Sequence, residues 1–246
     1  MIARKAVGLA FAASFGVVPP ALAQRSVQVG AEVTNDEVRR GLSWSGGRAS
    51  ASADALVAIG PVEASARIAA TRGSARYSDA DGVADLVLGT GWDLGAIRLR
   101  TTATGHLFTG VRSTINYVEF GSSATFALGP AQVSGGAIYA PSQDAIGGDN
   151  LYLHAGFDSG LPGTPFTAIA GIGHSSGDTD DPVRARRLRP VDSYTDWRLG
   201  VEYRQGRLTL GLSYIGTDVD RNAAISPFAD ARHAGDKIVG RARIDL

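Results

Sequence analysis

The chain lacks cysteine altogether, and its 24 basic side chains match its 24 acidic ones. The absence of cysteine excludes a disulfide scaffold, thiol chemistry and any zinc site built on cysteine. Because the net charge is zero, the chain has no excess of basic side chains to bind phosphates, so we expect no nucleic-acid partner. Glycine, by contrast, is abundant: 32 of the 246 residues, about 13%, indicate many turns and disfavour a helical bundle.

Residues 1–23 have the pattern of a secretory signal peptide. Arg4 and Lys5 provide the positive start, residues 6–18 form a short apolar run, and a small-x-small cleavage motif follows. A run of about thirteen apolar residues is too short to cross ~30 Å of hydrocarbon as a helix. No later apolar run is long enough either. We therefore expect residues 24–246 to form an exported domain that is either soluble or a β-barrel.

From Ser26 onward the apolar residues recur with a period of two. In residues 97–104, for example, one face carries Ile97 and Leu99 and the other carries Arg98 and Arg100. A helix would mix these two sets. The alternation predicts twelve strands, over residues 26–35, 49–59, 62–72, 84–94, 97–107, 116–128, 131–140, 149–158, 165–174, 195–204, 208–217 and 236–246.

The connections between these segments alternate in length along the whole chain. Five are tight and contain the glycine or proline that a hairpin turn favours, at residues 60–61, 95–96, 129–130, 160–163 and 205–206. Six are long and polar, at residues 36–48, 73–83, 108–115, 141–148, 175–194 and 218–235. This asymmetry is typical of outer-membrane barrels, in which periplasmic turns are short and extracellular loops are long.

The apolar face of the predicted strands carries no charged residue. Lipid contact would exclude charge there, because a charge at the bilayer midplane costs ~2–4 kcal/mol. The face includes Val27, Val29, Val33, Val57, Ile59, Ile68, Leu86, Leu88, Leu99, Val118, Phe126, Val133, Leu151, Leu153, Ala168, Ile172, Leu199, Val201, Leu210, Leu212, Ile238 and Ile244. A soluble sandwich would instead need a solvated outer face and protected edges.

Nine aromatic residues on the same face lie near the strand ends, as expected for rings at the two membrane interfaces. Those close to the short turns are Trp92, Phe126, Phe157, Phe166 and Tyr203, and those toward the long loops are Phe120, Tyr139, Trp197 and Tyr214. The sequence therefore predicts an all-β protein, a transmembrane antiparallel up-and-down barrel of about twelve strands.

The opposite face of the strands is polar and carries both signs of charge. The candidate lumen-lining residues are Glu32, Asp54, Glu63, Arg67, Asp85, Asp93, Arg98, Arg100, Glu119, Asp196, Arg198, Glu202, Lys237, Arg241 and Arg243, with His154, Asp158, Arg204 and Asp245 on the same face. The first four strands carry mostly carboxylates and the last strand is basic, so closure of the barrel brings opposite charges together. Water-separated charges would line a channel, whereas direct pairs would plug the lumen.

Several segments together resemble one known family. They are Thr34-Asn35, Arg40-Gly41-Leu42-Ser43, Gly160-Leu161-Pro162-Gly163, residues 194–201 (YTDWRLGV) and residues 208–220 (LTLGLSYIGTDVD). In this order they span nearly the whole mature chain and are similar to the TorF porin family of proteobacteria. The resemblance implies an outer-membrane barrel assigned as a porin, and it brings no catalytic residues.

Enzymatic and cofactor chemistry finds little support in the residues. His174 and Ser176 share a face near a long loop, as in barrel phospholipases, but those enzymes need a third polar residue, usually Asn, on the adjoining strand. The alternation places no Asn there. The four histidines are not spaced as metal ligands, and no phosphate-binding loop is present, so we expect no cofactor.

The sequence thus favours a non-enzymatic channel for passive diffusion of small hydrophilic solutes, in the outer membrane of a Gram-negative bacterium. The alternatives are a barrel with a plugged lumen in a structural or adhesive role, and a phospholipase-like barrel. Expected partners are outer-membrane lipid, lipopolysaccharide and the barrel-assembly machinery. The charged loop 175–194 could contact lipopolysaccharide phosphates, fold inward, or remain solvated.

Overall fold

Twelve strands form one closed antiparallel sheet in the computed structural model, which describes residues 25–111, 115–220, 222 and 226–246. Each strand pairs with its neighbours along the chain, and the last strand closes the barrel by pairing with the first, Glu32 opposite Arg243. The predicted fold class is therefore confirmed. The predicted signal peptide lies outside the described residues.

The strands of the barrel agree with the predicted segments to within a few residues. They are β1 (Arg25–Thr34), β4 (Ser50–Ile59), β5 (Val62–Ser74), β6 (Ala80–Leu94), β7 (Ile97–Thr109), β8 (Tyr117–Leu128), β9 (Ala131–Gln143), β10 (Gly148–Gly160), β11 (Phe166–Ser176), β12 (Tyr194–Gln205), β13 (Leu208–Thr217) and β14 (Lys237–Asp245). Among the described residues, no helix has the length and apolarity needed to span a bilayer.

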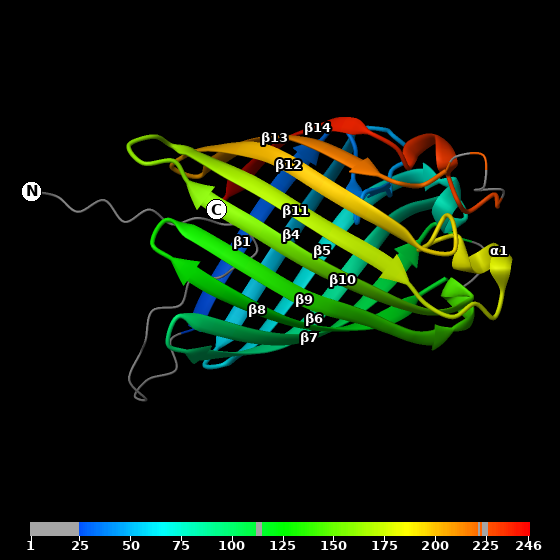
Figure 1. The fold of residues 1–246 in the computed structure, drawn as a ribbon, viewed down its shortest axis with the longest axis horizontal. Coiled ribbons are helices and arrows are strands. Elements are labelled where there is room, and N and C mark those ends of the chain that lie inside the picture. Colours follow the sequence, from blue (N-terminus) through cyan, green and yellow to red (C-terminus); the bar gives the residue numbers. More distant parts are fainter. Residues whose placement is uncertain (1–24, 112–114, 221, 223–225) are drawn as a thin grey trace, which may run out of the picture.

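The two ends of the barrel differ, as Figure 1 shows. At one end, hereafter the short-turn end, β4 to β5, β6 to β7, β8 to β9 and β12 to β13 are joined by two residues each. The long connections and the short helix α1 (Pro182–Ala185) lie at the other, the long-loop end. Two connections predicted to be long, 73–83 and 141–148, are shorter, because the flanking strands continue until only residues 75–79 and 144–147 remain.

The long connections contain their own local structure. Three of these connections contain a short 3-10 helical turn, namely η1 (Ala75–Tyr77), η2 (Asp144–Ile146) and η3 (Ala231–His233). The first connection forms a small hairpin from β2 (Val38–Arg39) and β3 (Leu42–Ser43), which was predicted only as a loop.

The outward positions of the wall carry the apolar side chains that the alternation predicts. Val27, Ile68, Leu88 and Leu199, for example, are each more than half exposed. Of the nine aromatics, Trp92 and Phe126 are exposed toward the short-turn end, and Phe120, Tyr139 and Tyr214 toward the long-loop end. In water this surface would be unstable, because a soluble monomer rarely exposes so extensive an apolar surface. It is therefore the lipid-facing surface of a membrane barrel.

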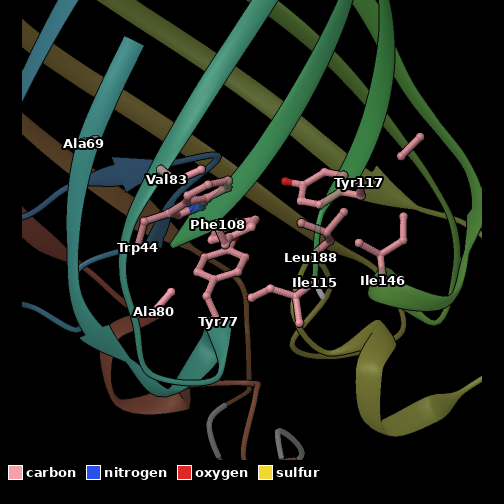
Figure 2. Packing of buried hydrophobic residues seen from close by; sticks show 11 residues of the cluster. Trp44, Ala69, Tyr77, Ala80, Val83, Phe108, Ile115, Tyr117, Ile146 and Leu188 are labelled. Atoms are coloured by element: carbon pink, nitrogen blue, oxygen red, sulfur yellow. The ribbon is translucent and has the colours of Figure 1, made fainter. Parts of the chain in front are cut away.

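A packed core lies at the long-loop end. Trp44, Tyr77, Phe108 and Tyr117 form an aromatic cluster with Ile115, Ile146 and Leu188, which Figure 2 shows from close by. The Tyr77 and Phe108 rings stack at 4.6 Å between centroids, and Trp44 lies 4.4 Å from Tyr77. Offset and tilted rings at these distances are favourable beyond their burial. The cluster joins residues from β7 and β8 to residues from five of the long connections.

Candidate functional site in the barrel lumen

The hairpin Val38–Ser43 extends from the first long connection toward the opposite wall. Its turn is Arg40-Gly41, and both residues have positive φ, 50° and 73°. A two-residue turn with positive φ at both positions matches the twist of a tight hairpin. A Cβ at Gly41 would lie 2.5 Å from the Thr217 side chain and 2.7 Å from Asp196, so the tip of the hairpin is packed against β12 and β13.

The two arginines of the hairpin hold a buried charge network on β6, β7 and β8. Arg39 lies 2.7 Å from Asp85, and Arg40 lies 2.6 Å from Glu119. Between the two carboxylates, the His106 ring contacts Asp85 through Nδ1 at 2.7 Å and Glu119 through Nε2 at 3.2 Å. Buried charges are stable only when paired and hydrogen-bonded, and here each arginine meets a carboxylate. The network ties the hairpin to this wall.

Glu37, just before the hairpin, receives a second set of ion pairs. Arg67 donates to both of its carboxylate oxygens at 2.8 and 2.9 Å, and Arg39 donates at 3.0 Å. Burial raises the pKa of Glu37, but the hydrogen bonds and charges of Arg67 and Arg39 outweigh burial and hold the pKa below its ordinary value. The neighbouring Asp36 pairs with Lys237 at 3.3 Å.

Tyrosines on the opposite wall bind the tip of the hairpin. The Tyr194 hydroxyl donates to the Arg40 carbonyl at 2.9 Å, and the Arg40 guanidinium lies 4.8 Å from the centre of the Tyr152 ring. The hairpin is therefore attached to β6 and β8 on one side and to β10 and β12 on the other. It crosses the lumen.

Arg76 fastens the long connections to one another. It has no exposed surface, and its guanidinium donates to the carbonyls of Ser43 at 3.2 Å, Arg186 at 3.3 Å, Arg187 at 2.9 Å and Ala229 at 2.6 Å. These acceptors belong to three different connections. A buried cation with carbonyl acceptors on this many segments holds them in one arrangement.

The connection at residues 177–193 folds inward over part of its length. Leu188 belongs to the aromatic cluster, and the buried Arg189 donates to the carbonyls of Gly177, Asp178 and Asp192. Of the three expectations for this loop, inward folding describes this part. Contact of the loop with lipopolysaccharide stays a prediction.

The predicted charged residues nearer the short-turn end pair with one another. Arg243 binds both oxygens of Asp54, at 2.5 and 3.0 Å, and Arg241 binds Glu32 at 2.9 Å. Further contacts join Arg241 to Glu202, Arg100 to Glu63, Arg98 to Asp93, Arg67 to Glu32 and Arg243 to Asp245. The acidic first strands thus meet the basic last strand, as barrel closure predicts.

A cavity of about 340 Å³ remains between the hairpin tip and the wall formed by β9 to β13. Arg40, Tyr152, His154, Asp196 and Arg198 contribute polar groups to it. Gly171, which lies opposite Arg198 in the register, leaves space there, because a Cβ at this position would meet only ordinary contacts. The cavity is large enough for a small solute.

His174 and Ser176, the one constellation that resembles a nucleophile site, lack the geometry of a catalytic pair. Thr195 stands on the adjoining strand where a phospholipase would carry Asn, and its hydroxyl contacts His174 Nδ1 at 3.1 Å. In the part of the chain that the structure describes, no hydrogen bond joins Ser176 to His174. No cluster of three or more potential metal ligands occurs among these residues either.

The hairpin and its partners are the part of the site that sequence analysis missed. Asp36, Glu37, Arg39 and Arg40 fall in a segment predicted only as a polar loop. The sequence did contain one weak signal. Three tyrosines at the long-loop ends of their strands fall on the polar, inward-facing side of the alternation: Tyr117, Tyr152 and Tyr194. Aromatic residues on an inward face indicate that something packs against them.

The comparisons with known proteins agree with this architecture. Residues 26–239 match the family described as "Bacterial protein of unknown function (Gcw_chp)", and the chain belongs to this family. A search of curated proteins found no significant match. The match therefore establishes the Gcw_chp family, and the TorF name rests on the resemblance alone.

Solved structures show the same fold. The KdgM porin is 5% identical with a TM-score of 0.55, over 90% of this chain and 98% of its own. A membrane protein from a study of in-meso crystallization is 12% identical with a TM-score of 0.51, over 89% of this chain and 83% of its own. At these identities the likeness shows the fold alone, a closed antiparallel β-barrel.

Proposed function

We propose that this protein is a narrow channel in the outer membrane of a Gram-negative bacterium, through which small hydrophilic solutes diffuse passively. The observation that carries the proposal is the cavity beside the hairpin tip, with charged groups around it and paired charges toward the short-turn end. The fold shared with the KdgM porin and the resemblance to the TorF porins support it. Lipopolysaccharide, outer-membrane lipid and the barrel-assembly machinery are the partners that this location implies.

The route that we propose follows the wall from β9 to β13. Inward positions on this wall are repeatedly glycine, among them Gly156, Gly171 and Gly211. A Cβ at Gly171 would meet no atom closer than 3.6 Å, and the nearest atoms at Gly156 and Gly211 belong to the side chains of Ser134 and Arg241. The opposite wall instead carries Asp85 and Glu119, which bind the hairpin, and His106, which contacts both carboxylates. Space therefore remains on the glycine-bearing side.

The proposed mechanism involves no covalent step. Charged groups of both signs replace part of the hydration shell of a solute as it passes. Because the charges are largely paired, the wall is close to neutral, and we expect only weak selectivity between cations and anions. The hairpin, attached on both sides, acts as the constriction that limits the size of the solute.

The second candidate function is a barrel with a plugged lumen in a structural or adhesive role. The hairpin that crosses the lumen and the buried Arg76 favour this alternative. The two functions differ in one measurable property, the presence of discrete conductance steps.

Single-channel recording in planar bilayers tests the proposal. We expect the purified protein to show small discrete steps, and Gly171→Leu, which fills the cavity, to reduce them at least about threefold. Gly105→Leu is the matched control, because Gly105 lies among lipid-facing residues and a Cβ there meets no atom within 4 Å. Silence of the unmodified protein, with steps only after residues 37–44 are replaced by a Gly-Ser linker, would instead establish a plugged barrel.

A further inference from the structure

The cavity contains a buried carboxylate with unused hydrogen-bonding capacity. Asp196 is 7% exposed, and its Oδ1 atom accepts a hydrogen bond from the Tyr152 hydroxyl at 3.2 Å. Its Oδ2 atom is buried and has no hydrogen-bond partner. A buried carboxylate oxygen without a donor is costly, so a partner that supplies N–H or O–H groups would be bound favourably.

A cation lies on the same strand and faces the same cavity. Arg198 donates through Nε to the Ser213 hydroxyl at 3.1 Å, and within the described residues its guanidinium forms no ion pair. The other arginine at the cavity, Arg40, is already paired with Glu119. Arg198 therefore has its terminal N–H groups available, and a planar guanidinium fork suits a carboxylate.

The two groups have a fixed spacing. Asp196 and Arg198 are two residues apart on β12, so their Cα atoms are separated by roughly 6.6 Å along one face of the strand. Gly171 and Gly173, opposite them on β11, carry no side chains that would separate them. A ligand that holds a cation and an anion a few ångströms apart can contact both.

We propose that the cavity is a binding site for a small zwitterion of the α-amino acid class. The ligand's ammonium group binds Asp196 Oδ2, and its carboxylate binds the terminal nitrogens of Arg198. Val38, Ile138 and Ile215, which also line the cavity, provide apolar contacts for a short aliphatic side chain. This inference names the solute class for the channel proposed above and rests on that function for its physiological meaning.

The charges of the cavity disfavour the simpler ligands. An anion alone would compensate Arg198 but would be repelled by Asp196, and a cation alone would meet the reverse situation. A neutral polyol would satisfy hydrogen bonds but leave both charges unneutralised. Only a zwitterion compensates both, and in a partly dehydrated cavity that difference is large.

Equilibrium dialysis of the detergent-purified full-length protein tests the inference with matched probes. L-alanine carries both charges, propionate only the anion and ethylammonium only the cation. We expect L-alanine to bind at least tenfold more tightly than either ion. Equal binding of the three probes, or preference for one of the single ions, would overturn the proposal.

Variants on the same strand separate binding from folding. Asp196→Asn and Arg198→Gln should each weaken L-alanine binding at least tenfold, and Asp196→Asn should not lower the unfolding temperature, because it removes an uncompensated buried charge. Arg204→Gln is the control, since Arg204 lies on β12 toward the short-turn end and outside the cavity, and should bind L-alanine normally. Retained binding in both cavity variants would overturn the site.

The two proposals can fail separately. Conductance of potassium chloride without preferential binding of L-alanine would retain the channel and remove the zwitterion site. Binding of L-alanine by a barrel that shows no conductance steps would retain the site and remove the channel function.

Discussion

The two halves of the lumen are filled by different chemistry. At the long-loop end, Trp44, Tyr77 and Phe108 pack as in the core of a water-soluble protein, and Arg76 connects the segments above them. Toward the short-turn end, part-buried ion pairs such as Asp54 with Arg243 span the wall, with 12% and 14% of their side chains exposed. A single barrel thus combines a half filled by a packed aromatic core and an inserted hairpin with a half in which charged side chains of the wall pair with one another.

This difference shows how the length of the connections determines what fills the lumen of a barrel. Twelve strands enclose more space than the side chains of the wall alone need to fill. At the long-loop end, long polar segments are available to enter that space and bring aromatic residues with them. The two-residue turns at the other end are too short to do so, and charged side chains of the wall pair there instead.

Replacement of Arg76 is expected to have the largest effect on the packed half. Arg76→Met leaves carbonyls of three connections without their donor, and we expect the free energy of unfolding to fall by about 4 kcal/mol. Urea titration in detergent micelles or bilayers measures the change. Arg72→Met, an exposed arginine four residues earlier, should change stability by less than about 0.5 kcal/mol. Similar losses in the two variants would show that Arg76 does not hold the loops.

Protonation of Glu37 should release the hairpin in acid. Because the folded pKa of Glu37 is lowered by Arg67 and Arg39, its stabilisation is complete above the unfolded value of about 4.3 and is lost as pH falls through the folded pKa. We expect Glu37→Gln to cost about 2 kcal/mol at pH 7.

Measuring the unmodified protein and Glu37→Gln across the same pH range isolates the contribution of this one carboxylate to stability, since all other titratable groups are common to both. The difference in unfolding free energy between the unmodified protein and Glu37→Gln should shrink as the pH falls below about 4.3, and it should vanish once the pH lies below the folded pKa of Glu37. A difference that stays constant from pH 7 to pH 3 would contradict the role of Glu37.

The polar half should show the smallest coupling. Asp54 and Arg243 form two hydrogen bonds but remain in contact with solvent, which weakens their attraction. A double-mutant cycle of Asp54→Asn and Arg243→Gln should give a coupling of about 1 kcal/mol, measured by the same urea titration. A coupling as large as the Arg76 effect would remove the distinction between the two halves.

Much of the wall was predictable from local pattern. The alternation around Ile97 to Arg100 assigns each side chain to a face, because a strand has a period of exactly two residues and lipid excludes charge from one face. The proximity of the acidic first strands to the basic last strand follows from closure of the barrel, since the last strand must meet the first. These inferences need only neighbouring residues and one topological rule.

The hairpin and the cavity were not predictable in this way. Residues 36–48 are rich in charge and glycine, a composition typical of an exposed loop, and nothing local shows that Arg39 and Arg40 will meet Asp85 and Glu119 on distant strands. The space beside Gly171 exists only because the hairpin tip stops at Thr217 and Asp196.

The sequence by itself determined the strands, their two faces and the alternation of short and long connections. These features depend on whether each residue faces lipid or water. Because successive residues of a strand face opposite sides, a period of two residues in the sequence encodes that choice directly. Only the tertiary structure decided what occupies the lumen. That outcome depends on which charged and aromatic groups meet across the barrel, and pairings between residues so far apart in the chain leave no periodic signal in it.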